Sequence, residues 1–151
     1  MKLELRPLRE SDLPQVIQIE GRSFAAPWSE STFRGLMRRP SACLMAAERA
    51  GKLVGFFAMW FAADEAELGD LVVHPVYRRE GIGGKLLAFA LQEARRRAAK
   101  TVFLEVRESN HAAKALYEAA GFSVLAIRKG YYSMPNEDAI VMRLELVEGA
   151  R

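Results

Sequence analysis

The sequence is poor in residues that bind metal ions or form cross-links. Its 151 residues include one cysteine, Cys43, and two histidines, His74 and His111. A single cysteine excludes a disulfide within the chain and a zinc site built from several thiolates. His74 precedes Pro75 at the end of a predicted strand, which favours a structural role. His111 falls in the first turn of a predicted helix with no second histidine nearby, so we expect no metal.

Long hydrophobic runs and a strong net charge are also missing. No apolar stretch approaches the roughly 18 residues that span a bilayer. The N-terminal segment MKLELRPLRESD lacks the apolar core and small-residue cleavage site of a signal peptide. The net charge of +3 is too small to indicate nucleic-acid binding. We therefore expect a cytoplasmic protein with no membrane and no direct nucleic-acid partner.

The composition that remains is that of an ordinary globular protein, with 50% hydrophobic and 27% charged residues. The length suits one domain with a real core, and neither a repeat nor a linker divides the chain. We expect a single domain over 1–151, as a monomer or a weak dimer.

Hydrophobic periodicity predicts a mixed α/β fold in the order β-α-α-β-β-β-α-β-α-β-β. The expected helices cover 12–22, 29–39, 83–98 and 111–120. The expected strands cover 3–8, 41–49, 52–62, 67–74, 101–106, 122–129 and 138–146. The long helix 83–98 predicts one right-handed crossover in the sheet.

The segment RREGIGGK, residues 78–85, places three glycines at the start of a strong helical pattern. The first turn of a helix leaves N–H groups without partners, and glycines let a phosphate approach them. The spacing fits neither G-x-x-x-x-G-K-[ST] nor G-x-G-x-x-G. The residues alone favour a phosphate site modestly over a glycine-rich connection that binds nothing.

The same segment resembles a known family once its surroundings are included. RREGIG at 78–83 matches the Q/R-x-x-G-x-G/A signature of the GCN5-related N-acetyltransferase (GNAT) superfamily, and NHAAKALYEAAGF at 110–122 matches a second family segment. FAAPWSESTF, LEVRESN, ALYEAAGF and RKGYYSMPNEDAIVM are similar to the RimI branch, whose members acetylate the N-terminal amine of small-subunit ribosomal protein eighteen.

The resemblance implies a GNAT fold: a mostly antiparallel, splayed central sheet with a parallel central pair, flanked by about four helices. Acetyl-CoA would enter between the strands at 67–74 and 101–106. The cofactor contacts it implies are Leu71, Val72, Val73, Arg78, Arg79, Glu80, Gly81, Ile82, Gly83, Gly84 and Asn110. Asn110 reads equally well as a helix N-cap.

Two residues carry the expected chemistry. Glu105 interrupts the otherwise apolar strand TVFLEV. Burying such a carboxylate costs free energy unless it pairs with a cation or has a functional role. The structural alternative is a pair with Arg107 or with another cation across the sheet. The resemblance implies that Glu105 is the proton acceptor. Tyr117 lies on an apolar helix stripe, where a core role is the default, and the resemblance implies that it protonates the departing thiolate.

The resemblance also implies a peptide site and an oxyanion site. Trp28, Tyr131 and Tyr132 would contact the peptide, although Trp28 serves equally well as a hydrophobic staple of the second helix. A backbone N–H near Val72–Val73, at a family bulge, would meet the oxyanion. Asp70 stands where several relatives carry an uncharged amide, and its role is open.

The resemblance therefore implies transfer of acetyl from acetyl-CoA to the α-amine of a protein N-terminus, by direct attack in a ternary complex, and we expect the acceptor to be the alanine of small-subunit ribosomal protein eighteen. An α-amine has a pKa of about 8, so part of it is neutral without help. The alternatives are acetylation of a small amine or lysine, and an acyl-CoA sensor without catalysis. Retention of both Glu105 and Tyr117 weighs against a sensor.

Overall fold

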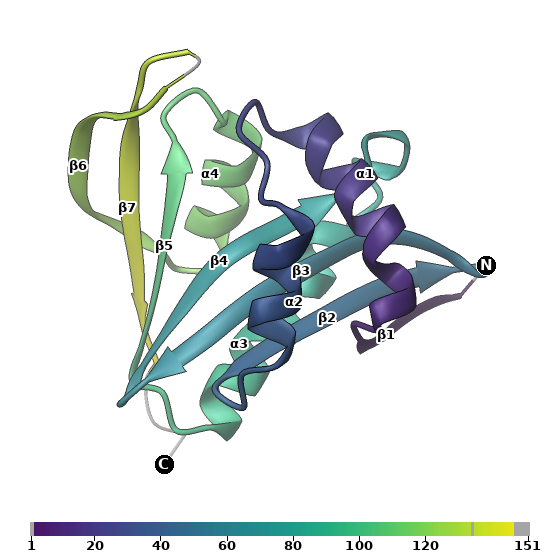
Figure 1. Cartoon of the computed structure of the whole chain (residues 1–151). Coiled ribbons are helices and arrows are strands. Elements are labelled where there is room, and N and C mark those ends of the chain that lie inside the picture. Colours follow the sequence, from purple (N-terminus) through teal and green to yellow (C-terminus); the bar gives the residue numbers. More distant parts are fainter. Residues whose placement is uncertain (1, 134, 147–151) are drawn as a thin grey trace.

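A seven-stranded sheet dominates the computed structural model, which describes residues 2–133 and 135–146 (Figure 1). Its strands are β1 (Leu3–Pro7), β2 (Ala42–Arg49), β3 (Lys52–Ala62), β4 (Glu65–Val73), β5 (Thr101–Arg107), β6 (Ser123–Tyr132) and β7 (Glu137–Glu145). The helices are α1 (Leu13–Ser23), α2 (Glu30–Met37), α3 (Ile82–Arg96) and α4 (His111–Ala119). Short 3-10 helices, Glu10–Asp12 and Pro75–Tyr77, precede α1 and follow β4.

The strand order is β1-β2-β3-β4-β5-β7-β6, and within the described residues only the central β4–β5 pair is parallel. The chain passes from β4 to β5 through α3, as a parallel connection requires. The mixed α/β architecture, its element order and the parallel central pair are confirmed. The predicted domain 1–151 includes residues 1, 134 and 147–151, which lie outside the description.

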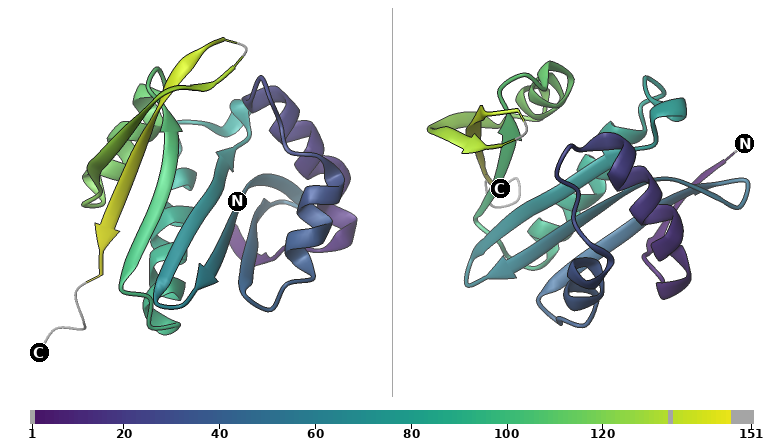
Figure 2. Two further views of the ribbon diagram at one scale, coloured as in Figure 1. Left: turned by 60° about the vertical axis from the view of Figure 1, so that its left-hand side comes forward. Right: turned by 45° about the horizontal axis from the view of Figure 1, so that its top comes forward.

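Helices cover both faces of the sheet (Figures 1 and 2). On one face, α1 and α2 bury Leu13, Val16 and Phe33 against β2, β3 and β4. On the other face, α3 and α4 bury Leu86 and Tyr117 in a second cluster, to which β5 and β7 also contribute. We call these the α1/α2 face and the α3/α4 face. None of the helices in the described part of the chain is long and apolar enough to cross a membrane.

Strand β4 contains an irregularity that alternation in the sequence does not reveal. Ala58 of β3 pairs with Asp70, but the next residue, Met59, pairs with Leu68, so Gly69 is an extra residue, a β-bulge. Leu68 therefore packs on the α3/α4 face, whereas Val72 packs on the α1/α2 face. The bulge expected near Val72–Val73 lies at Gly69 instead, and this changes which side chains face α1.

Element ends differ from the expectation by a few residues, with one difference that affects the site. Strand β6 runs to Tyr132 rather than ending at 129, so Tyr131 and Tyr132 lie at the end of a strand and not in a loop. Pairing between Tyr132 and Glu137 of β7 extends the strand that far.

Candidate functional site

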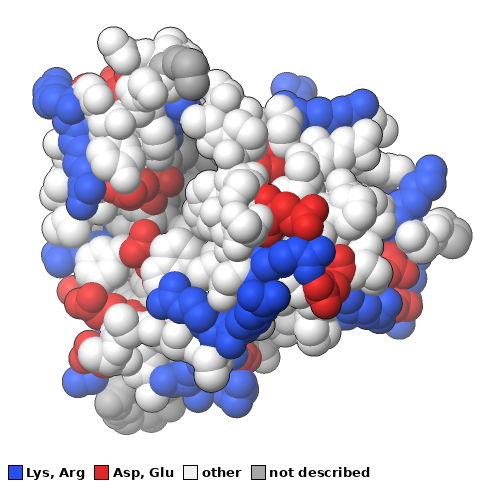
Figure 3. All heavy atoms as spheres, in the orientation of Figure 1, with Lys and Arg blue, Asp and Glu red and all other residues white. Residues whose placement is uncertain are grey.

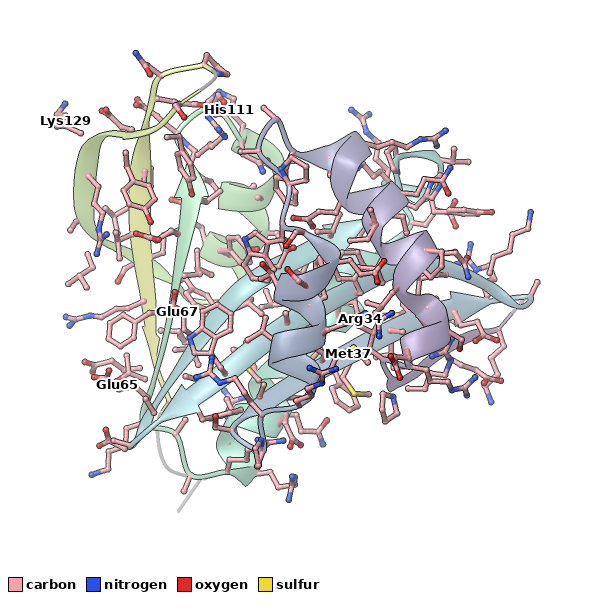
Figure 4. All side chains as sticks on the ribbon, in the orientation of Figure 1. Arg34, Met37, Glu65, Glu67, His111 and Lys129 are labelled. Atoms are coloured by element: carbon pink, nitrogen blue, oxygen red, sulfur yellow. The ribbon has the colours of Figure 1, made fainter. Side chains whose placement is uncertain are left out.

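The sheet opens between its two central parallel strands. Pairing between β4 and β5 is restricted to Glu65–Thr101, Ala66–Val102 and Glu67–Phe103, after which the strands diverge. Figure 1 shows them meeting at one end and separating toward α4, and Figure 4 shows Glu67 beside this opening. The space-filling view has a furrow on this face, with acidic side chains along it (Figure 3). The predicted splay is confirmed, and we call this opening the β4–β5 gap.

The end of β4 presents main-chain groups to the gap. His74 donates its N–H to the carbonyl of Val54 on β3 at 2.8 Å. Because main-chain groups alternate in direction along a strand, Val72 also faces β3, whereas Leu71 and Val73 face the gap. The side chain of Val72 is buried on the α1/α2 face. Of the three residues predicted to contact the cofactor here, Leu71 and Val73 thus have main-chain groups that point into the gap, and the carbonyl of Val73 already accepts a hydrogen bond from Arg78.

The glycine-rich turn connects the end of β4 to α3. Gly81 is the N-cap residue of α3 and has φ = +79°, a left-handed conformation that glycine adopts without strain. Lys85 donates the first intrahelical hydrogen bond, to the carbonyl of Gly81 at 3.2 Å. The N–H groups of Ile82, Gly83 and Gly84 precede it and have no partner within the helix. The turn thus forms the bare helix N-terminus that an anion requires.

The charged side chains of the turn have different surroundings. Arg78 donates from Nε to the carbonyl of Val73 at 3.2 Å and from Nη2 to Ser23 Oγ at 3.3 Å, which fastens the turn to β4 and α1. Glu80 pairs with Arg49 of β2, so only its main chain is free for a ligand. Arg79 is exposed, with φ = +68°. Arg79 is thus the arginine of this turn with a free side chain.

Asn110 caps α4, as one of its two interpretations predicted. Its Oδ1 accepts a hydrogen bond from the N–H of Ala113 at 3.2 Å. His111 is the next residue and lies in the first turn of α4, where Figure 4 labels it. The cofactor contact expected of Asn110 remains a prediction.

Glu105 lies on β5 and faces the α1/α2 face, because its neighbours Leu104 and Val106 pack on the α3/α4 face. Its Oε2 is 3.3 Å from Nε of Arg128 on β6. The cation that pairs with Glu105 is therefore Arg128, across the sheet, and not Arg107. Oε2 is buried and accepts no hydrogen bond from the described residues, because its contact with Arg128 lacks hydrogen-bond geometry. A donor from a ligand would satisfy it.

Tyr117 projects from α4 and is 7% exposed. Its ring packs against Phe122, with centroids 5.7 Å apart. Burial raises the pKa of Tyr117 well above its ordinary value, and the charge of Asp70 and then Tyr132 add to the effect. The hydroxyl therefore keeps its proton at neutral pH. Asp70 on β4 and Tyr132 on β6 are therefore within electrostatic reach of this hydroxyl.

The two tyrosines at the end of β6 contact cations. The guanidinium of Arg107 lies 4.3 Å from the ring centroid of Tyr132, and that of Arg128 lies 5.2 Å from the ring centroid of Tyr131. Tyr131 is 51% exposed. Burial, followed by the charge of Glu105, raises the pKa of Tyr132 to about 12. Tyr132 thus borders Glu105, while Tyr131 offers an open aromatic surface beside it.

Trp28 has the staple geometry. It precedes Ser29, the N-cap of α2, and its ring lies 5.4 Å from that of Phe33, the fourth residue of the helix. Its ring is also 6.1 Å from that of Trp60 on β3. A Cβ added to Gly69 would meet Trp28 at 3.0 Å and Trp60 at 2.1 Å. The two tryptophans therefore cover the bulge in β4, and the peptide contact expected of Trp28 remains a prediction.

Sequence reasoning missed two contributors to this region, Arg128 and Glu20. Arg128 pairs with Glu105. Glu67, which the sequence offered either as a group that orients an incoming amine or as a solvated edge charge, lies beside the gap, where burial and then the charge of Glu105 raise its pKa. Glu20 of α1 is buried with Asp70. A signal for Glu20 was present, because it follows Leu13 and Val16 at the spacing of the buried helix stripe.

The residues at the gap suit acetyl-CoA. The unpartnered N–H groups of the turn and the absence of side-chain atoms at its glycines fit a pyrophosphate. A Cβ at Gly83 would already touch Leu116 and Val73 at 3.5 and 3.6 Å, so the turn is closely packed on its inner side.

No group of three potential metal ligands occurs within 2–133 and 135–146. Burial raises the pKa of the Cys43 thiol, which disfavours the thiolate.

Comparisons with known proteins agree with this geometry. The family model for the acetyltransferase (GNAT) family matches residues 11–122. The chain is 40% identical, over 92% of its length and 95% of the relative's, to the ribosomal protein bS18-alanine N-acetyltransferase of Escherichia coli K12. The crystal structure of the Escherichia coli ribosomal-protein-S18-alanine N-acetyltransferase superposes with a TM-score of 0.89 at 37% identity, covering 99% of both chains. That of Ard1 from Thermoplasma volcanium gives 0.91 at 26% identity, covering 98% of this chain and all of the other.

Proposed function

The chain belongs to the acetyltransferase (GNAT) family, and from this membership we propose that it acetylates the N-terminal α-amine of a protein, the alanine of ribosomal protein bS18. The observation that carries the proposal is similarity over almost the whole chain to enzymes named for that reaction. Similarity restricted to the glycine-rich turn would support only the use of acetyl-CoA.

Acetyl-CoA supplies an acetyl thioester, and the residues of this chain would hold it along β4 and the turn. The N–H groups at Ile82, Gly83 and Gly84 would bind the pyrophosphate. The main-chain groups of Leu71 and Val73 would bind the part of the cofactor that lies in the gap. An N–H from this end of β4 would donate to the thioester oxygen as it becomes negative.

Two side chains would move the protons. Glu105 would accept a proton from the substrate amine, directly or through water, because its buried Oε2 accepts no hydrogen bond from the described residues. Tyr117 would donate the phenolic proton to the departing sulfur, because its hydroxyl is protonated at neutral pH. Glu105 faces the α1/α2 face from β5 and Tyr117 lies on the α3/α4 face, so the base and the acid would reach the tetrahedral intermediate from the two faces of the sheet.

The peptide would approach over the α1/α2 face, where Tyr131, Tyr132 and Trp28 border Glu105 and the bulge. Tyr131 is exposed, so a peptide can stack on it without rearrangement of the core. The acidic side chains Glu67 and Glu105 at this opening favour a positively charged N-terminus on electrostatic grounds.

The test is incubation with isotope-labelled acetyl-CoA and three substrates, with the products mapped by mass spectrometry. The first substrate is a peptide that begins with the N-terminal residues of bS18. The second is the same peptide with its α-amine blocked and with an internal lysine added, and the third is a polyamine. We expect label on the free α-amine alone. Label on the lysine or the polyamine, with none on the α-amine, would contradict the proposed substrate. No label anywhere would contradict acetyl transfer.

A further inference from the structure

Two carboxyl groups from different elements are buried together beside the gap. Glu20 on α1 is 2% exposed, and Asp70 on β4 is 7% exposed. Asp70 follows the bulge at Gly69, which turns its side chain from the α3/α4 face to the α1/α2 face, toward α1. The bulge is therefore what brings Asp70 to Glu20.

Two oxygens of this pair, one on each carboxyl group, receive no hydrogen bond. Glu20 Oε2 accepts the main-chain N–H of Trp28 at 3.0 Å. Glu20 Oε1 and Asp70 Oδ2 are both buried and have no hydrogen-bond partner among the described residues. Two ionised carboxylates in this place would repel each other, and one oxygen of each would lack a donor, at a cost of several kcal/mol. One proton held between them would remove the repulsion and give one oxygen a donor and the other an acceptor.

The surroundings of Asp70 agree with a shared proton. Burial raises the pKa of Asp70 well above its ordinary value, and its contact with the Glu20 carboxyl adds to the rise. The charged or titratable groups that face the pair are each other, from α1 and β4, and Tyr117 from α4. Ala58, the neighbour of Asp70 on β3, is uncharged. Among the groups that shift the pKa of Asp70, none is a cation.

We propose that Glu20 and Asp70 share one proton and act as positioning residues for acetyl transfer, by fastening the bulged strand β4 to α1. The inference rests on the proposed function. Leu71 and Val73, which face the gap, follow Asp70 directly, so the position of Asp70 sets theirs. Loss of the shared proton places two negative charges in a buried site, separates α1 from β4 and shifts these main-chain groups.

The pair also controls the charge near Tyr117. The negative charge of Asp70 is one cause of the raised pKa of Tyr117, so the hydroxyl senses the protonation state of the pair. With the proton in place the pair carries one negative charge, and without it two. The second charge makes the phenolic proton harder to release. Acetyl transfer therefore declines at high pH, in step with the pair.

The experiment compares Asp70→Asn, Glu20→Gln and the wild type. Each amide variant keeps a donor between the two side chains and one negative charge, but has no shared proton to lose. The ratio of variant to wild-type kcat/KM is measured against pH with acetyl-CoA and the bS18 peptide, because the ratio cancels the titration of the substrate amine. Glu93→Gln, in the last turn of α3 and paired with Arg96 and Arg97, is the control.

We expect the ratio to rise severalfold toward high pH, alike in both amide variants, and to stay flat in the control. The two variants agree because the titration belongs to the pair and not to either residue. A flat ratio, or a rise in one variant only, would overturn the proposal.

Carboxyl carbon NMR tests the shared proton without reference to activity. In the wild type we expect two carboxyl signals that respond to one common titration above the ordinary range of Asp and Glu, and we expect each amide variant to lose it. Two independent titrations at ordinary values would overturn the proposal even in an active enzyme. A common titration in a protein that acetylates nothing would instead refute the proposed function and leave the shared proton standing.

Discussion

Glu105 and Arg128 form an ion pair that spans the sheet from β5 to β6, with Oε2 and Nε 3.3 Å apart. The same guanidinium lies against the ring of Tyr131. The side chain of Arg128 is 58% exposed, whereas that of Glu105 is 23% exposed, so solvent screens the arginine more than the acid. A peptide that stacks on Tyr131 would therefore contact Arg128 and approach the carboxylate from the same side.

Charge at the glycine-rich turn should abolish cofactor binding. In Gly83→Glu a carboxylate stands among the free N–H groups where the pyrophosphate would lie, and we expect no acetyl-CoA binding by calorimetry. Gly83→Ala is the matched control, because its Cβ meets Leu116 and Val73 at ordinary contact distances of 3.5 and 3.6 Å. We expect it to bind with less than about a tenfold loss, or about 1.4 kcal/mol. Normal binding by the glutamate variant would refute the phosphate site.

Removal of one hydroxyl should slow the chemistry without loosening the fold. Tyr117→Phe keeps the ring contact with Phe122 and loses only the proposed acid. We expect single-turnover acetyl transfer to slow by about 10²-fold or more, with acetyl-CoA affinity and the thermal midpoint nearly unchanged. Full activity would place the acid elsewhere. An equal loss of binding and rate would indicate a packing role.

The bulge in β4 should tolerate no side chain at Gly69. A Cβ there would come within 2.2 Å of two ring atoms of Trp60, so the ring or the strand must move. We expect Gly69→Ala to lower the free energy of unfolding by about 1–3 kcal/mol. Gly35→Ala is the control, since a Cβ at this position in α2 meets nothing within 4 Å, and we expect about 0.5–1 kcal/mol of stabilisation. Equal stability of the two variants in urea would contradict the packing described.

The buried acid should make the fold less stable as the pH rises. The unfolded chain releases the proton of Asp70 near pH 3.9, while the folded chain holds it to a higher pH. Between these two values the folded state binds more protons, so its stability falls with increasing pH. Asp70→Asn has no such proton. We expect the free energy of unfolding of Asp70→Asn, measured in urea, to rise relative to that of the wild type from pH 4 toward neutrality. If the two free energies change with pH in parallel, the raised pKa of Asp70 is contradicted.

The sequence predicted what periodicity and local spacing determine. The order of elements and the cap at Asn110 follow from alternation and helical spacing, whereas the splayed parallel pair was implied by the resemblance to a known family. The bulge at Gly69 could not be predicted in this way, because ELGDLVV has the pattern of one regular strand and only the register with β3 shows the extra residue. Glu20 and Arg128 were missed for a related reason. Their partners are 50 and 23 residues away in the chain, and the fold alone brings them together.

The most direct test of the account is single-turnover transfer to the bS18 peptide by Glu105→Gln and Arg128→Gln. Both variants break the same ion pair, but only the first removes the carboxylate. With the acetyl-CoA affinity of each variant measured in parallel, we expect Glu105→Gln to lose about 10²- to 10⁴-fold in rate and Arg128→Gln to lose less than about tenfold. Equal losses would contradict the account, because they would show that Glu105 serves only as the partner of Arg128.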